Sequence, residues 1–164
     1  MLNILYGWCG SSVDNTKQIQ FVTKSICNKY SIDCKQQSFS SGGIASFSKY
    51  KKTINYSDEN YICSIIGHVF INNQNKKQNL DKNFVKNLLD NYKQSGTSFI
   101  EQLKGQFILS IIDKRQSSCL IVNDTMATFP VFYNLSSNGQ FTFSNHLDLL
   151  AHSPLNSFKL NPQA

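Results

Sequence analysis

The sequence contains no long hydrophobic run. No window of its 164 residues comes near the roughly 18 apolar residues that a membrane-spanning helix needs. The apolar segment at residues 2–8 is too short for the core of a signal peptide, and it has no positively charged flank. We therefore predict a cytoplasmic protein with no membrane partner.

Patterns typical of a metal or redox centre are also missing. The cysteines are odd in number, irregularly spaced and without a C-x-x-C pair: Cys9, Cys27, Cys34, Cys63 and Cys119. No cluster of cysteines or carboxylates accompanies His146 and His152 near the end of the chain. These absences predict reduced, mostly buried cysteines and no metal site.

The sequence has no long basic run. The formal net charge is +6, but the lysines occur singly or in pairs, such as Lys51-Lys52 and Lys76-Lys77. Nucleic-acid binding requires basic residues that are clustered as well as numerous. We therefore predict no nucleic-acid partner.

What the sequence does contain is the material for a hydrophobic core. Hydrophobic residues make up 40% and aromatic residues 12% of the chain, and both are spread along its whole length. A chain of this length can bury such a core within one domain. We predict one domain over residues 1–155.

Apolar residues at three- and four-residue spacing predict four helical segments. Ile19, Val22 and Ile26 mark one face of a helix over residues 13–30. A second stripe begins at Phe84 and predicts a helix over residues 83–96, with Gly96 as its stop. Shorter helices are predicted over residues 99–105 and 145–152.

Strands are predicted before, between and after these helices. The first covers residues 2–8, and residues 32–52 suggest two strands around a Ser-Ser-Gly-Gly turn at residues 40–43, with Gly42-Gly43 in the turn. Residues 61–71 form a continuous apolar run, as in a strand buried on both faces. Hairpins follow, built from residues 106–113, 119–124, 130–135 and 140–144. The order of elements predicts an α+β fold with antiparallel sheets packed against helices.

An ordered set of short motifs occupies residues 98–160. In chain order these are Leu103-Lys104-Gly105, Phe107 with Asp113, Asn123-Asp124, Pro130 to Tyr133, and Phe143 to Leu147. Together they resemble the N-terminal glutamine amidotransferase domain of asparagine synthetases and their relatives. No single motif is diagnostic, but the ordered set over about 60 residues is a strong signal. Five of its positions are identified as structural family residues: Gly105, Asp113, Asp124, Pro130 and Tyr133.

The resemblance implies a fold and a reaction. The fold is the Ntn-hydrolase sandwich, in which two antiparallel sheets lie between two helical layers (αββα). The reaction is hydrolysis of glutamine to glutamate and ammonia by an N-terminal cysteine. The free amine of that cysteine takes the proton of its own thiol.

This sequence departs from the family at the reacting positions. The family begins Met-Cys-Gly-Ile, whereas this chain begins Met1-Leu2-Asn3-Ile4, and Leu2 offers neither nucleophile nor base. The family's Asn-Gly pair of oxyanion donors corresponds to Ile66-Gly67, so Gly67 and His68 are expected to mark a vestigial glutamine pocket. We therefore expect a degenerate domain with no catalytic residue.

Two further family positions have no clear counterpart. The Arg-Gly-Pro-Asp segment that holds the substrate carboxylate is absent from residues 35–60. Asp81 stands near the place of the aspartate that binds the substrate amine, but its spacing to the next helix does not fit. We transfer no role to Asp81.

Cys9 provides an alternative hypothesis. Cleavage of a propeptide after Trp8 would expose Cys9-Gly10, a pair like the family's own, and would give an active glutaminase. Such cleavage would remove the first predicted strand, so a structural cysteine at the end of that strand is the favoured interpretation.

The end of the chain resembles the start of a further domain. In relatives of asparagine synthetase, a segment like that at residues 156–164 leads into an ATP-using synthetase domain. The resemblance implies that domain as the partner, with ATP and Mg²⁺ as its cofactors and none for residues 1–155. Relatives without the cysteine include beta-lactam synthetases and lasso-peptide cyclases, which form amides without ammonia. A standalone binding module is a third hypothesis, and the oligomeric state, a homo-oligomer included, stays open.

Asp124 has lost the charge partner that the family would give it. Asn123 stands where the family has arginine. A buried carboxylate without a donor is costly, so we expect Asp124 to accept hydrogen bonds from the turn that follows. Thr125 and Thr128 are the nearest side-chain candidates.

Overall fold

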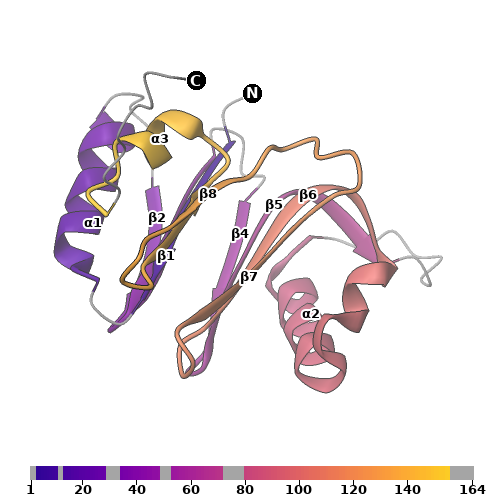
Figure 1. Cartoon of the computed structure of the whole chain (residues 1–164). Coiled ribbons are helices and arrows are strands. Elements are labelled where there is room, and N and C mark those ends of the chain that lie inside the picture. The colour runs from indigo at the N-terminus through magenta and orange to yellow at the C-terminus, as the bar shows by residue number, and fades with distance from the viewer. Residues whose placement is uncertain (1–2, 11–12, 29–33, 49–52, 72–79, 156–164) are drawn as a thin grey trace.

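The computed structural model describes residues 3–10, 13–28, 34–48, 53–71 and 80–155 (Figure 1). The segment at 156–164, which the sequence predicts to lead toward another domain, lies outside the described residues. No helix in the described ranges combines the length and apolar character that crossing a membrane requires.

The first sheet has five strands in the order β2-β3-β1-β9-β8. Its members are β1 (Asn3–Cys9), β2 (Cys34–Phe39), β3 (Gly42–Ser48), β8 (Phe132–Leu135) and β9 (Phe141–Ser144). The central strand, β1, is antiparallel to β3 on one side and to β9 on the other. All seven of its residues are buried, so the predicted first strand is the middle of this sheet.

The second sheet has four strands in the order β4-β5-β6-β7. Its members are β4 (Thr53–Ser57), β5 (Tyr61–Ile71), β6 (Leu103–Asp113) and β7 (Ser118–Asn123). The two long strands, β5 and β6, pair antiparallel over their whole length.

Helices cover the outer face of each sheet. The five-stranded sheet is covered by α1 (Asn15–Val22), a π-helical turn, η1 (Thr23–Asn28), and α3 (Leu147–Ala151). The four-stranded sheet is covered by α2 (Lys82–Ser95) and the 3₁₀ helix η2 (Gly96–Gln102) (Figure 1). The predicted α+β sandwich of two antiparallel sheets is confirmed, and its layer order is αββα.

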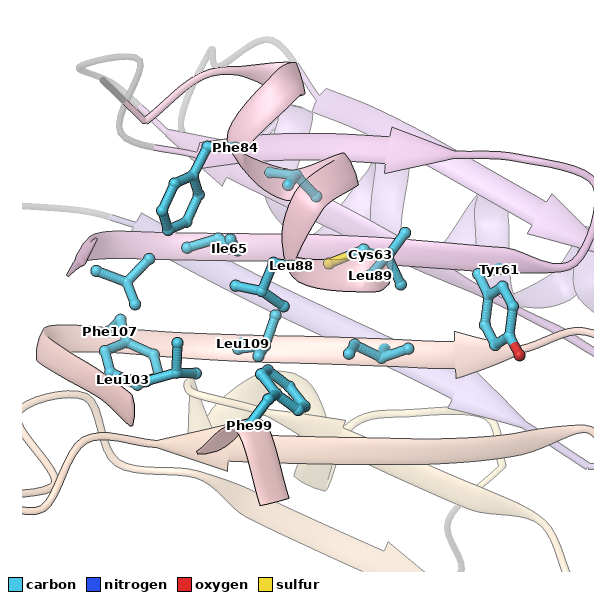
Figure 2. Close-up of a cluster of buried hydrophobic side chains, with 13 residues drawn as sticks. Tyr61, Cys63, Ile65, Phe84, Leu88, Leu89, Phe99, Leu103, Phe107 and Leu109 are labelled. Carbon is cyan, nitrogen blue, oxygen red and sulfur yellow. The ribbon is translucent and has the colours of Figure 1, made fainter. Parts of the chain in front are cut away.

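Three apolar clusters hold the four layers together. One joins α2 and η2 to the outer face of β5 and β6, and Figure 2 shows Leu88 and Leu89 of the helix among Cys63, Ile65 and Leu109 of the strands. A second joins α1 and α3 to β1 and β3. The third lies between the sheets and contains Leu5, Ile44, Ile62, Ile66, Ile108, Ile112 and Phe143.

One boundary and one whole strand differ from the sequence-based expectation. The short helix predicted over 99–105 is wrong in its last turn, because β6 begins at Leu103, which pairs with Ile71 at the end of β5. Pairing with β5 and burial of the Leu103 side chain outweigh local helical spacing there. The strand β4 was not predicted. Its inward-facing residues are polar, so its sequence lacks the pattern of apolar residues facing the core that indicates a strand.

The turn predicted at residues 40–43 is confirmed for its two serines and wrong for Gly42-Gly43. The hairpin turns at Ser40-Ser41, and both glycines belong to β3. Trp8 of the neighbouring strand explains them: a Cβ atom on Gly43 would lie 2.5 Å from Trp8 Cζ2. Glycine is therefore needed here for space rather than for a turn.

Gly43→Ala should lower the free energy of unfolding by about 1–3 kcal/mol, because the added methyl group overpacks a buried indole. Urea denaturation of both proteins measures this difference. Ser40→Ala, an exposed position on the same hairpin, serves as the control and should change stability by less than about 0.5 kcal/mol. Equal effects of the two substitutions would contradict the packing explanation.

Candidate functional site

Polar side chains replace apolar ones over one part of the inter-sheet space. Because side chains alternate along a strand, Ser46 of β3 shares a face with Ile44, and Ser64 of β5 shares a face with Ile62. Asn55 of β4 connects the two serines. Its Nδ2 donates to Ser46 Oγ at 2.6 Å, and its Oδ1 accepts from Ser64 Oγ at 2.9 Å. This chain of hydrogen bonds links the two sheets.

A cavity of about 660 Å³ lies beside these hydrogen bonds, a size typical of small-molecule sites. We call it the inter-sheet cavity. It is lined by Lys35, Ser46, Ser48, Thr53, Ile54, Asn55, Leu80, Asp81 and Lys82. Ser46 and Thr53 are buried and form its floor, whereas Lys35, Asp81 and Lys82 are exposed and form its rim. The cavity therefore combines buried hydroxyl groups with a charged entrance.

The first residue of β1 lies next to this cavity. Asn3 pairs with Ser48, and Ser48 Oγ donates to Asn3 Oδ1 at 2.9 Å. Asn145 binds the same end of the strand, because its Nδ2 donates to the Asn3 carbonyl at 2.8 Å and its Oδ1 accepts from Leu5 N at 2.7 Å. The strand thus starts with an asparagine, one residue after Leu2, the position at which the resemblance implies a nucleophile.

Asp81 lines the inter-sheet cavity although sequence spacing gave it no role. Its Oδ1 accepts from Phe84 N at 2.9 Å, which makes Asp81 the N-cap of α2. A capping signal was present in the sequence, since an aspartate stands three residues before the first apolar residue of the helical stripe. The signal predicts a helix start, but not the cavity next to it.

Gly67 and His68 do not line the inter-sheet cavity. Gly67 has a φ of 96° and Gly105 a φ of 123°, and the two glycines lie in adjacent strands. A side chain on Gly67 would overlap the carbonyl oxygen of Gln106, and one on Gly105 would overlap that of His68. Close approach of β5 and β6 therefore explains both glycines, and the His68 side chain is exposed.

Cys9 lies at the far end of β1 from the cavity. It lies six positions along the strand from Asn3, a distance of about 20 Å. Cys9 pairs with Gly42 and with Phe141, and only 4% of it is exposed. Burial raises the pKa of its thiol, which disfavours the nucleophilic thiolate.

Asp124 anchors the turn between β7 and β8. Its Oδ1 accepts from Met126 N at 3.0 Å and from Thr128 Oγ1 at 3.0 Å, and its Oδ2 accepts from Thr128 N at 3.2 Å and from Phe107 N at 3.3 Å. The expected contact with Thr128 is present, whereas the structure gives none to the Thr125 side chain. Burial alone would raise the pKa of Asp124, but these hydrogen bonds outweigh it and lower the pKa below its ordinary value.

The other structural family positions lie away from the inter-sheet cavity. Asp113 ends β6 and holds Arg115 with an Oδ2–Nη2 distance of 2.9 Å. Pro130 precedes the edge strand β8, and Tyr133 on that strand is 69% exposed, with its ring 6.0 Å from that of Phe141. Among the described residues, no group of three or more histidines, cysteines or carboxylates could hold a metal ion.

Comparison with known families adds one match. A family model described as a glutamine amidotransferase domain matches residues 72–164, more than half of the 164-residue chain. The chain belongs to the glutamine amidotransferase domain family. No curated protein sequence matches it. In this amidotransferase domain, the matched part includes α2, the β6–β7 hairpin, the Asp124 turn and the β8–β9 hairpin.

Asp124→Ala should lower the free energy of unfolding by about 1–3 kcal/mol at neutral pH, because four backbone and hydroxyl donors lose a charged acceptor. Thermal or urea unfolding measures the loss. Asp148→Ala, which removes an exposed carboxylate from α3, is the control, with an expected change below about 0.5 kcal/mol. An unchanged melting temperature in Asp124→Ala would rule out the anchoring role.

The same carboxylate should make stability depend on pH. Since the folded pKa of Asp124 is lowered, its contribution is present above the unfolded pKa and is lost as the pH falls through the folded value. The stability difference between the unmodified protein and Asp124→Asn should therefore shrink between about pH 5 and about pH 2. A difference that stays constant over this range would mean that the carboxylate charge does not contribute.

Proposed function

We propose that this amidotransferase domain is degenerate and hydrolyses no glutamine. The observation that carries the proposal is the position of Cys9. The thiol is buried within the pairing of β1 with β3 and β9, at the other end of the strand from the inter-sheet cavity. Amidotransfer of this class needs a cysteine whose own free amine acts as the base, and a residue paired on both sides within a sheet offers no such amine.

The residues around the strand start support the same conclusion. The resemblance implies a nucleophile at position 2, where this sequence has Leu2, and Asn3 follows; neither residue offers a thiol or a hydroxyl group. Ile66, which stands where the family has the asparagine of its oxyanion pair, belongs to the apolar cluster between the sheets. An isoleucine side chain cannot donate a hydrogen bond to a developing oxyanion.

The role that fits a degenerate domain is structural. We propose that it forms the N-terminal half of an asparagine synthetase-related, ATP-dependent ligase of the beta-lactam synthetase or lasso-peptide cyclase type. The motifs over residues 98–160 and the family match support this proposal. A C-terminal synthetase domain of the same protein would be the partner, and it would bind ATP and Mg²⁺.

The alternative of an active Cys9 meets a physical obstacle. Cleavage after Trp8 would remove six of the seven residues of β1. β3 and β9 would then lose the strand that lies between them. Burial of Trp8, Tyr6 and Ile4 in the core against α1 and α3 would be lost as well.

A binding role is the second candidate function. The inter-sheet cavity favours it, because its buried hydroxyl groups and charged rim form a site that does not depend on a nucleophile.

The purified protein should release glutamate and ammonia from glutamine no faster than buffer alone, because no cysteine amine is available as the base. A coupled glutamate assay measures the rate. Cys9→Ala and Cys63→Ala provide a matched pair, since both remove a buried thiol, one from each sheet. Ammonia release that disappears in Cys9→Ala but persists in Cys63→Ala would overturn the proposal.

A further inference from the structure

The floor of the inter-sheet cavity contains a hydroxyl group without a partner. Thr53 is only 7% exposed, and its Oγ1 makes no hydrogen bond. Buried polar atoms in proteins are nearly always hydrogen-bonded, so an orphan group in the lining of a cavity points to a missing ligand. The neighbouring Asn55, in contrast, uses both ends of its amide group.

The second floor residue also has a proton to donate. Ser46 Oγ accepts the hydrogen bond from Asn55 Nδ2, and this is the one hydrogen bond that the structure gives to the Ser46 side chain. Its hydroxyl hydrogen is therefore available. Since Thr53 also has a free hydroxyl hydrogen, the floor offers two donors to an acceptor group.

The rim favours negative charge. Lys35 and Lys82 carry positive charge at the entrance, against one carboxylate, Asp81. One oxygen of that carboxylate already caps α2 by accepting from Phe84 N. The positive end of the α2 dipole adds to the two lysines, because Lys82 is the first residue of this 14-residue helix.

We propose that the inter-sheet cavity binds a short aliphatic dicarboxylate. One carboxylate accepts hydrogen bonds from the Ser46 and Thr53 hydroxyl groups at the floor, and the other pairs with Lys35 and Lys82 at the rim. The volume of about 660 Å³ accommodates such a molecule. The inference rests on the proposed function in one respect: a cavity without a nucleophile holds its ligand without turning it over.

Calorimetric titration of the full chain with glutarate tests the proposal. Glutarate should bind saturably, and the neutral diamide glutaramide should bind at least about tenfold more weakly, because charge-assisted hydrogen bonds are lost. Equal binding of the two compounds, or no binding of glutarate, would overturn the proposal.

Two pairs of variants locate the site. Thr53→Val and Lys82→Gln should each weaken glutarate binding by about five- to tenfold. Ser110→Ala removes another buried, unpartnered hydroxyl away from the cavity, and Lys86→Gln removes the same charge one turn further along α2. These two controls should bind glutarate like the unmodified protein. Weakening in the controls to the same extent would place binding elsewhere.

Two further measurements, the melting temperature and glutamate release, separate effects on folding and hydrolysis from effects on binding. Thr53→Val should keep its melting temperature without ligand, because the hydroxyl group that it loses has no partner. Glutamate release from glutamine would overturn the proposed function. The glutarate titration would still decide, independently, whether the inter-sheet cavity binds a dicarboxylate.

Discussion

Pairing of β1 along both edges is the constraint on which the rest of the structure depends. Its partners are β3, which follows within the first third of the chain, and β9, the last described strand. Contact between β1 and β9 is tight, since any side chain on Gly7 would overlap the Phe143 ring. The five-stranded sheet is therefore complete only when segments from both ends of the chain have come together, and removal of β1 divides it.

The inter-sheet layer has two chemical halves. The apolar half, with Ile44, Ile62 and Phe143 among its members, supplies the hydrophobic contact between the sheets. In the polar half, burial of unpaired polar groups would cost free energy and destabilise the packing of the sheets. The hydrogen bonds of Asn55 to Ser46 and Ser64 offset most of this cost. The layered fold thus coexists with a polar cavity beside the start of β1.

Local sequence signals predicted the sheets and helices better than the site. Asp124 and Thr128 lie four residues apart, so their contact followed from the turn between two predicted strands. The inter-sheet cavity takes its lining from β2, β3, β4 and the start of α2, and no local pattern brings these segments together. Gly67 was expected in a vestigial pocket because of the family resemblance, whereas close approach of β5 and β6 accounts for it in space.

A chain that begins at Cys9, with residues 1–8 removed, tests the structural role of β1 most directly. Circular dichroism during heating would measure its folding, and a coupled assay would measure glutamate release from glutamine. The account predicts a chain without a cooperative unfolding transition and without glutaminase activity, because the five-stranded sheet lacks its centre. A cooperatively folded chain that releases glutamate, and loses this activity in Cys9→Ala, would contradict it.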